Sequence, residues 1–105
     1  MEERVGDFAA VGEDLARGRG DAYILRLNES IARFEQTVYI RLMPEMNGHW
    51  NAYCAYNLNG TFRGAAHSPA AYRQAWRRFA LIVRGGPASE INSKLRKLGM
   101  PPIQA

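Results

Sequence analysis

The chain has 105 residues, enough for one small domain, and its 47% apolar and 23% charged content is that of a folded protein. No apolar run approaches the ~20 residues of a membrane helix, and no signal peptide is visible, so no membrane span is expected and the location stays unknown. Arginine supplies 12 of the 14 basic residues in a net charge of +4, which permits an anionic partner without requiring one. The single cysteine, Cys54, excludes an internal disulfide, and with only His49 and His67 beside it we predict no metal and no other cofactor.

The first third of the chain contains one clear helix. Residues 1–19 give no firm pattern beyond a short helix near 7–16. Over 21–35 apolar residues recur every three to four positions, and Asp21 can cap the first turn with its carboxylate. The apolar face of this helix consists of Ile24, Leu27, Ile31 and Phe34.

Residues 37–43 change character, because Thr-Val-Tyr-Ile-Arg-Leu-Met is short, β-prone and almost continuously apolar. A strand buried on both faces of a parallel sheet has this composition. Pro44 ends it, since proline has no amide hydrogen to donate. Residues 44–67 then form a long loop rich in Asn, Gly, His and aromatic residues. Loops of this length inside compact domains are usually functional or disordered, and the aromatic content argues against disorder.

Two further helices are predicted after the loop. Ser68 is a good cap and Pro69 suits the first position of a helix over 69–84, which a Gly-Gly-Pro sequence ends. The last helix is predicted over 88–98. The apolar face of the helix over 69–84 consists of Tyr72, Trp76, Phe79 and Val83, and Arg73, Arg77, Arg78 and Arg84 lie mostly off it.

The order helix, strand, long loop, helix, helix is typical of an α/β protein. A single strand of the buried type would leave two unpaired edges, which a complete domain avoids. We therefore expect residues 1–105 to form one partial α/β domain, a slice of a larger fold that is marginally stable without the rest.

Residues suited to binding and cleaving a sugar gather where the predicted strand ends. Side chains alternate along a strand, so Arg41, Met43 and, if the extended conformation persists, Glu45 are expected on one face, with Glu45 at the carboxyl end, where barrel enzymes carry catalytic groups. A carboxyl group beside aromatic rings would have its pKa raised by desolvation, which suits a general acid. The residues that can bind sugar hydroxyls or stack on a pyranose ring are Asn47, Trp50 and Tyr53.

The run at 41–50, Arg-Leu-Met-Pro-Glu-Met-Asn-Gly-His-Trp, resembles the acid/base strand of glycoside hydrolase family 26. The pattern of that family is roughly Arg-Pro-x-His-Glu-Met-Asn-Gly-x-Trp-x-x-Trp, followed by a helix that opens with Pro and contains Tyr and Ala-Trp-Arg. Residues 68–72 and 75–77 match that helix. Residues 20–24 are similar to the start of the helix before the acid/base strand, so the resemblance spans roughly 18–84.

The resemblance implies part of a (β/α)8 TIM barrel and a retaining mechanism that hydrolyses O-glycosidic bonds in a β-linked polysaccharide, such as a β-mannan-like glycan. The family is often secreted. Pro44 stands where the family usually has His, and a second Trp is common at the position of Tyr53. By resemblance Glu45 is the catalytic acid/base, and the substrate-binding residues are Arg41, Asn47, Trp50 and Tyr53.

A retaining glycosidase needs two carboxylates about 5–5.5 Å apart. The resemblance assigns the second, the nucleophile, to a Glu on a strand far downstream, so we predict that the 105-residue chain alone is inactive and that the remaining barrel segments are required. Other interpretations stay open: Arg41 as a structural residue, and Trp50 as a core aromatic. A different function is also open, that of a small non-catalytic basic helical module that binds a protein partner or, less favoured, nucleic acid through Arg73, Arg77, Arg78 and Arg84.

Overall fold

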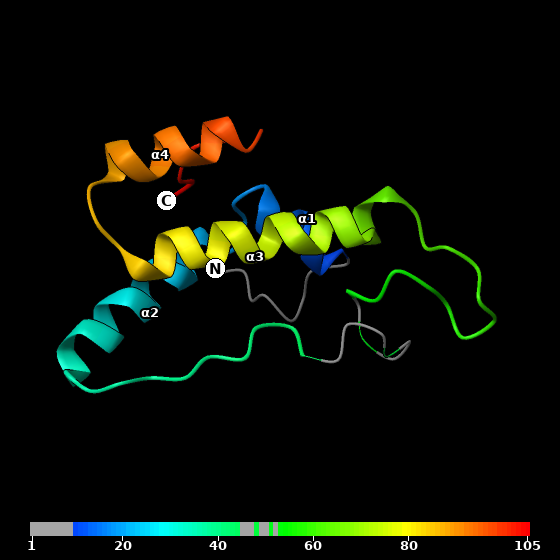
Figure 1. Ribbon diagram of the computed structural model, residues 1–105, viewed down its shortest axis with the longest axis horizontal. Helices are drawn as coiled ribbons and strands as arrows, with labels where there is room; N and C mark the ends of the chain where they lie inside the picture. Colours follow the sequence, from blue (N-terminus) through cyan, green and yellow to red (C-terminus); the bar gives the residue numbers. More distant parts are fainter. Residues whose placement is uncertain (1–9, 45–47, 49–50, 52) are drawn as a thin grey trace.

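The computed structural model is built around one central helix. It describes residues 10–44, 48, 51 and 53–105. The central helix, α3, contacts each of the other α-helices of this part of the chain; α1 and α2 pack against it, and α4 runs alongside it, above it in the view of Figure 1. The elements are α1 (Val11–Ala16), α2 (Asp21–Phe34), the 3-10 turn η2 (Ala65–His67), α3 (Pro69–Arg84) and α4 (Ala88–Lys97).

α3 begins and ends at the residues that the sequence predicts. The Ser68 hydroxyl oxygen accepts a hydrogen bond from the backbone N–H of Ala71 at 3.1 Å. Pro69 occupies the first turn, where its missing N–H removes no helical hydrogen bond. Gly85 ends the helix with φ at 78°, a value that glycine adopts easily because it has no side chain.

The other helices differ from their predicted ranges only at their ends. α1 ends at Ala16, as predicted for the 7–16 helix, and begins at Val11 with Ala10 as its N-cap residue; residues 7–9 lie outside the described residues. α2 stops one residue before 35, because Glu35 turns into the left-handed region with φ at 57°. α4 stops one residue before 98, and Gly99, with φ at 80°, redirects the chain. None of the helices in the described ranges is long and apolar enough to cross a membrane.

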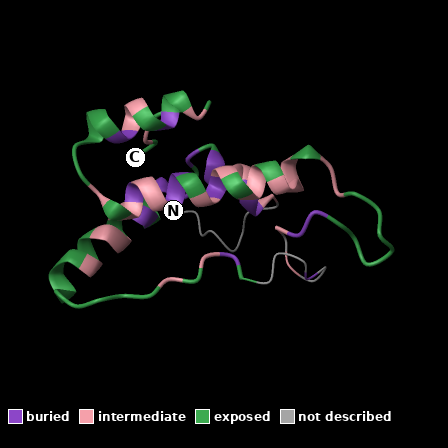
Figure 2. Cartoon of the chain, viewed as in Figure 1, coloured by how far each residue is buried: buried purple, intermediate pink, exposed green. Residues whose placement is uncertain are grey.

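Two clusters of buried apolar side chains lie along α3 (Figure 2). Burying one large aliphatic or aromatic side chain contributes about 1.5–3 kcal/mol, so these clusters are the main source of stability. α3 supplies residues to both and thereby links them. The larger cluster consists of Ala16, Ile24, Phe79, Ile82, Ile91, Leu95 and Met100, and the smaller one of Val11, Leu15, Met43 and Ala75.

The apolar face predicted for α2 is only partly used. Ile24 in its first turn is buried, whereas Phe34 in its last turn is 57% exposed. Figure 1 shows the reason: the end of α2 extends beyond α3, so it has no helix to pack against. The sequence pattern identifies the face of this helix but not how far its neighbour covers it.

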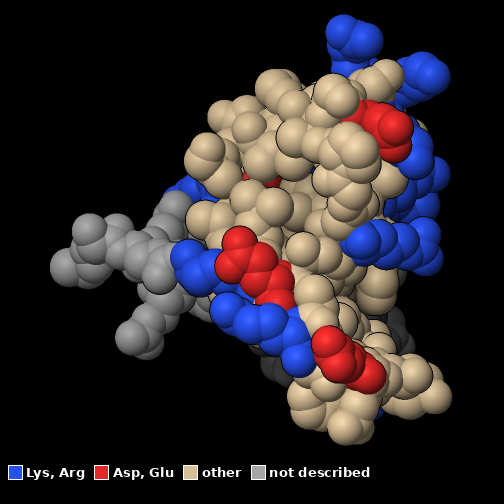
Figure 3. All heavy atoms as spheres, turned by 90° about the vertical axis from the view of Figure 1, so that its left-hand side faces the viewer, with Lys and Arg blue, Asp and Glu red and all other residues tan. Residues whose placement is uncertain are grey.

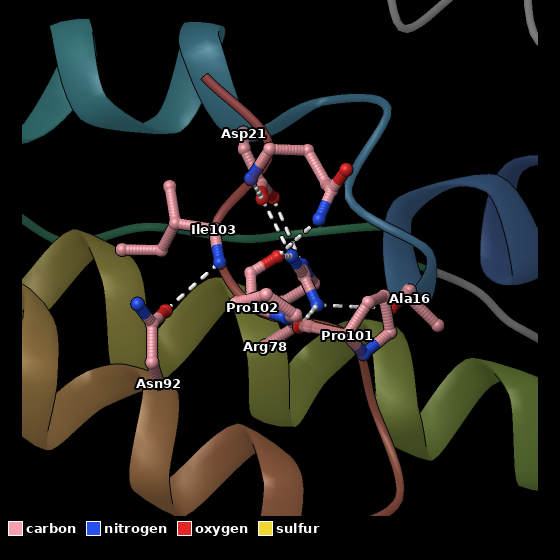
Figure 4. Close-up of polar contacts among 8 residues, drawn as sticks. Ala16, Asp21, Arg78, Asn92, Pro101, Pro102 and Ile103 are labelled. Atoms are coloured by element: carbon pink, nitrogen blue, oxygen red, sulfur yellow. Dashed lines mark hydrogen bonds and ion pairs between the residues drawn. The ribbon is translucent and has the colours of Figure 1, made fainter.

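A buried ion pair joins α2 to α3 (Figure 4). The Arg78 guanidinium donates from Nε to Oδ1 of Asp21 at 2.9 Å and from Nη2 to Oδ2 at 2.6 Å. Both side chains are fully buried. Asp21 is thus not the cap that its position predicts: Gly20 is the N-cap residue, and its helix end has no side-chain cap. Arg78, predicted to lie off the packed face of its helix, is at the centre of the molecule.

Residues 101–104 add further hydrogen bonds to this ion pair. Arg78 also donates to the backbone carbonyls of Ala16, Pro101 and Pro102, at 3.3, 2.7 and 2.8 Å. The backbone N–H of Gln104 donates to Oδ2 of Asp21 at 2.8 Å. Hydrogen bonds to several neighbours are what a charged pair requires when it leaves water. Four separate parts of the chain therefore meet at one guanidinium group.

The predicted α/β fold, with a strand over 37–43 as part of a TIM barrel, is wrong. The described residues form helices, turns and extended segments, and their one β-type contact is an isolated bridge between Tyr56 and Phe62. Residues 37–42 are extended but make no backbone hydrogen bond to the rest of the described chain. Tyr39 in this segment is 92% exposed. A β-prone composition favours a strand only where a neighbouring strand is present to pair with it, and the described residues offer none to this segment.

Candidate functional site

The structure describes part of the predicted sugar-binding site. Arg41 and Tyr53 lie within the described residues, whereas Glu45, Asn47 and Trp50 lie outside them. Arg41 is exposed and Tyr53 is half-buried. The described part of this site is therefore the chain on either side of Glu45.

Two tyrosines hold the backbone immediately before Glu45. The hydroxyl of Tyr72, from the first turn of α3, donates to the carbonyl of Met43 at 2.7 Å. The hydroxyl of Tyr53 donates to the carbonyl of Pro44. The two rings contact each other in a tilted arrangement, with centroids 6.0 Å apart. Consecutive carbonyls are thus fixed by side chains from two different parts of the chain.

Trp76 extends this support into α3. Its indole N–H donates to the Tyr72 hydroxyl at 3.3 Å, so Tyr72 accepts one hydrogen bond and donates another. Trp76 also packs edge-on against Phe79, with ring centroids 6.2 Å apart. The Tyr-x-x-x-Trp spacing of the helix thus places an aromatic pair one turn apart on the side that faces the candidate site.

Met43 makes the chain turn just before the candidate acid/base. Its φ is 47°, in the left-handed region, which costs a residue other than glycine roughly 1–2 kcal/mol. Its side chain offsets this by inserting into the smaller buried cluster beside Val11, Leu15 and Ala75. The prediction that Arg41 and Met43 point the same way is therefore wrong, because Arg41 is exposed and Met43 is buried.

The long loop after the candidate site is organised by polar side chains rather than by regular structure. Arg63 donates from Nη1 to the carbonyl of Asn51 at 2.7 Å and from Nε to Oδ1 of Asn57 at 3.0 Å. Asn57 donates in turn to the Thr61 hydroxyl at 3.0 Å. Arg63, near the end of the loop, is thus hydrogen-bonded to Asn51, which follows the predicted sugar-binding residue Trp50 in the sequence.

Sequence reasoning missed the contributions of Tyr72, Arg63 and Arg78. The sequence predicts Tyr72 on the apolar face of its helix, and no local pattern shows that its hydroxyl reaches a carbonyl 29 residues earlier. The hydrogen bonds of Arg63 and Arg78 could not be predicted either, because their partners Asn51 and Asp21 lie 12 and 57 residues away along the chain. A helical arginine in register with buried neighbours Ala75, Phe79 and Ile82 is the signal that could have identified Arg78.

The remaining candidate groups of the described residues are the single thiol, the potential metal ligands and the basic residues of α3. Cys54 is buried, and its thiol contacts the carbonyl of Tyr56 at 3.3 Å. Within the part of the chain that is described, no group of three His, Cys, Asp or Glu side chains could hold a metal ion. Arg78 is fully buried, so it is removed from the predicted nucleic-acid surface.

Comparison with known proteins returns no relatives: no family model, curated protein or solved structure matches this chain. Its function is therefore inferred from its motif and from the local geometry around that motif.

Proposed function

We propose that this chain carries the acid/base segment of a glycosidase that hydrolyses β-linked polysaccharide with retention of configuration, with Glu45 as the acid/base. The observation that carries the proposal is the run Glu45-Met46-Asn47-Gly48-His49-Trp50, followed by a helix that opens with Pro69. In this reaction Glu45 would protonate the leaving oxygen in the first step and activate water in the second. Asn47 and Trp50 would bind the sugar by hydrogen bonding and ring stacking.

The backbone contacts before Glu45 support this assignment. A general acid must be held in place to within a fraction of an ångström to be effective. Tyr72 and Tyr53 fix the carbonyls of Met43 and Pro44, the two residues that precede Glu45.

Glycan binding by the 105-residue chain tests the proposal. We expect titration calorimetry with a β-1,4-mannan hexasaccharide to show binding, and Trp50→Ala to weaken it about tenfold or more, because stacking area and ring geometry are lost together. Phe62→Ala is the matched control, since Phe62 is an exposed aromatic of the same loop outside the motif. Equal binding by all three proteins, or no binding by any, would exclude the proposal.

The role of Glu45 is separated from that of the sugar-binding residues by Glu45→Gln. The amide has the same shape and keeps hydrogen-bonding capacity, so the affinity should stay within about threefold. We expect no turnover from the 105 residues alone, because a retaining reaction needs a second carboxylate about 5–5.5 Å away. Any turnover of a dye-linked mannan must disappear in Glu45→Gln; turnover that persists there would rule out Glu45 as the acid/base.

A further inference from the structure

A groove lies between α3 and α4, away from the candidate sugar site. It has a volume of about 450 Å³, and its lining is almost entirely apolar. Ala80 and Leu81 of α3 form one wall and Leu98 after α4 forms the other. Past Leu81 the groove continues into a smaller hollow of about 120 Å³, which is of mixed character: Ile91 and Pro87 are apolar, and Arg84, Glu90 and Lys94 are charged.

Basic residues border this apolar surface. Arg77 lies at one side of the groove and Lys94 and Lys97 at the other. Arg77 donates to the Gln74 side chain at 3.1 Å, and neither lysine forms an ion pair within the described chain. Figure 3 shows Lys and Arg side chains gathered along the right-hand edge of the molecule, with uncharged surface and one acidic patch beside them. The groove therefore combines an apolar floor with an excess of positive charge: one carboxylate, Glu90, lines the smaller hollow, and among the described residues it forms no ion pair with Lys94 or Lys97.

This combination limits the kind of occupant. Phosphate backbones bind to cations and polar groups, so an apolar floor gives nucleic acid no advantage. A small ligand is normally enclosed over most of its surface, whereas this groove is open along its length. An amphipathic helix matches it, because its apolar face can lie on the floor while acidic residues beside that face meet the cations.

We propose that the α3–α4 groove binds an acidic amphipathic helix of a partner protein. Leu81 and Leu98 contact the apolar face of that helix, and Arg77, Lys94 and Lys97 pair with its flanking carboxylates. This interaction is independent of the sugar site, and the two proposals can fail separately.

The test uses a designed helical peptide with Leu at every third or fourth position and Glu on both flanks, titrated into ¹⁵N-labelled chain. We expect amide shifts to map to Ala80, Leu81 and Leu98. Lys97→Glu should weaken binding at least about threefold, since it replaces an attractive pair with a repulsive one. Ala80→Glu should abolish binding by placing a charge on the floor, and an unchanged circular dichroism spectrum would show that this half-buried position of α3 tolerates the substitution.

Arg33→Glu is the matched control, because it changes the net charge by the same amount at an exposed position on α2. It should leave the affinity unchanged. The proposal is overturned if Arg33→Glu weakens binding as much as Lys97→Glu, if a sequence-scrambled peptide binds equally well, or if the designed peptide does not bind at millimolar concentration. Binding of a DNA duplex that Lys97→Glu weakens and Ala80→Glu does not would also overturn it.

Discussion

At the scale of single residues, the most consequential pair is Asp21 and Arg78. The two residues lie 57 positions apart in the chain, and both charged side chains are completely removed from water. A buried ion pair adds little stability over an apolar pair of the same size, yet loss of one member leaves the other charge without compensation. The pair therefore acts mainly to specify which segments come together.

Asp21→Asn should lower the free energy of unfolding by about 3–5 kcal/mol, because the Arg78 charge would stay buried without a counter-ion. Urea unfolding followed by circular dichroism at 222 nm measures this change. For a small domain stable by about 5–15 kcal/mol, the loss is large enough to shift the whole transition.

Arg17→Ala is the comparison for this prediction. Arg17 forms an ion pair with Glu13 on α1, but its side chain is 71% exposed. Exposed pairs of this type contribute roughly 0–1 kcal/mol, so the variant should unfold close to the parent. Similar losses in both variants would mean that the Asp21–Arg78 pair is not buried as described.

At the scale of elements, the helices were predictable and the arrangement of the segment over 37–43 was not. The helix over 69–84 has its signals in the local sequence: a serine cap, proline in the first turn and glycine after the last. Thr37 to Ile40 have equally clear β-forming character, but whether such a segment forms a strand depends on partners elsewhere. Local preferences fix a helix largely by themselves, whereas sheets depend on distant residues.

The same reasoning applies to the candidate site. Glu45, Asn47 and Trp50 could be proposed from one continuous run of sequence. Tyr72 could be placed on a helix, but its hydrogen bond to the Met43 carbonyl depends on how that helix lies against the turn. The chemical role of a residue can thus be predicted from its neighbours in sequence, whereas the tertiary hydrogen bonds that hold its backbone in place cannot.

Ser68→Ala should destabilise the protein by about 1 kcal/mol, because the N–H of Ala71 would lose its acceptor at the start of α3. Thermal or urea unfolding measures the loss. Ser89→Ala is the matched control: Ser89 lies in the first turn of α4, is exposed and makes no capping hydrogen bond. If both variants unfold alike, the Ser68 cap does not contribute.

At the scale of the whole molecule, stability is centred on α3. This helix contacts α1, α2 and α4 and contributes to both buried clusters. Residues 37–42 lie at the other extreme, because they make no backbone hydrogen bonds to other described residues and only Ile40 and Leu42 among them are partly buried against the core. Opening energies within one protein range from near zero to the full unfolding free energy, and these two regions should mark the ends of that range.

Hydrogen–deuterium exchange measured by mass spectrometry checks this expectation. Peptides covering 75–82 should be the most protected, and peptides covering 37–42 should exchange within the shortest labelling time. Strong protection over 37–42 in a monomer would contradict the structure, because it would require that segment to be hydrogen-bonded.

The cluster around Arg78 also affects when the protein can reach its final structure during synthesis. α2 leaves the ribosome before Arg78 and Gln104, yet its first residue, Asp21, pairs with Arg78 and accepts a hydrogen bond from the backbone N–H of Gln104. Helix α2 therefore cannot dock in its final position until residues 101–104 have emerged from the exit tunnel. Nascent chains that lack residues 101–104 should stay accessible to chaperones and proteases, and docking of α2 should follow translation of that segment.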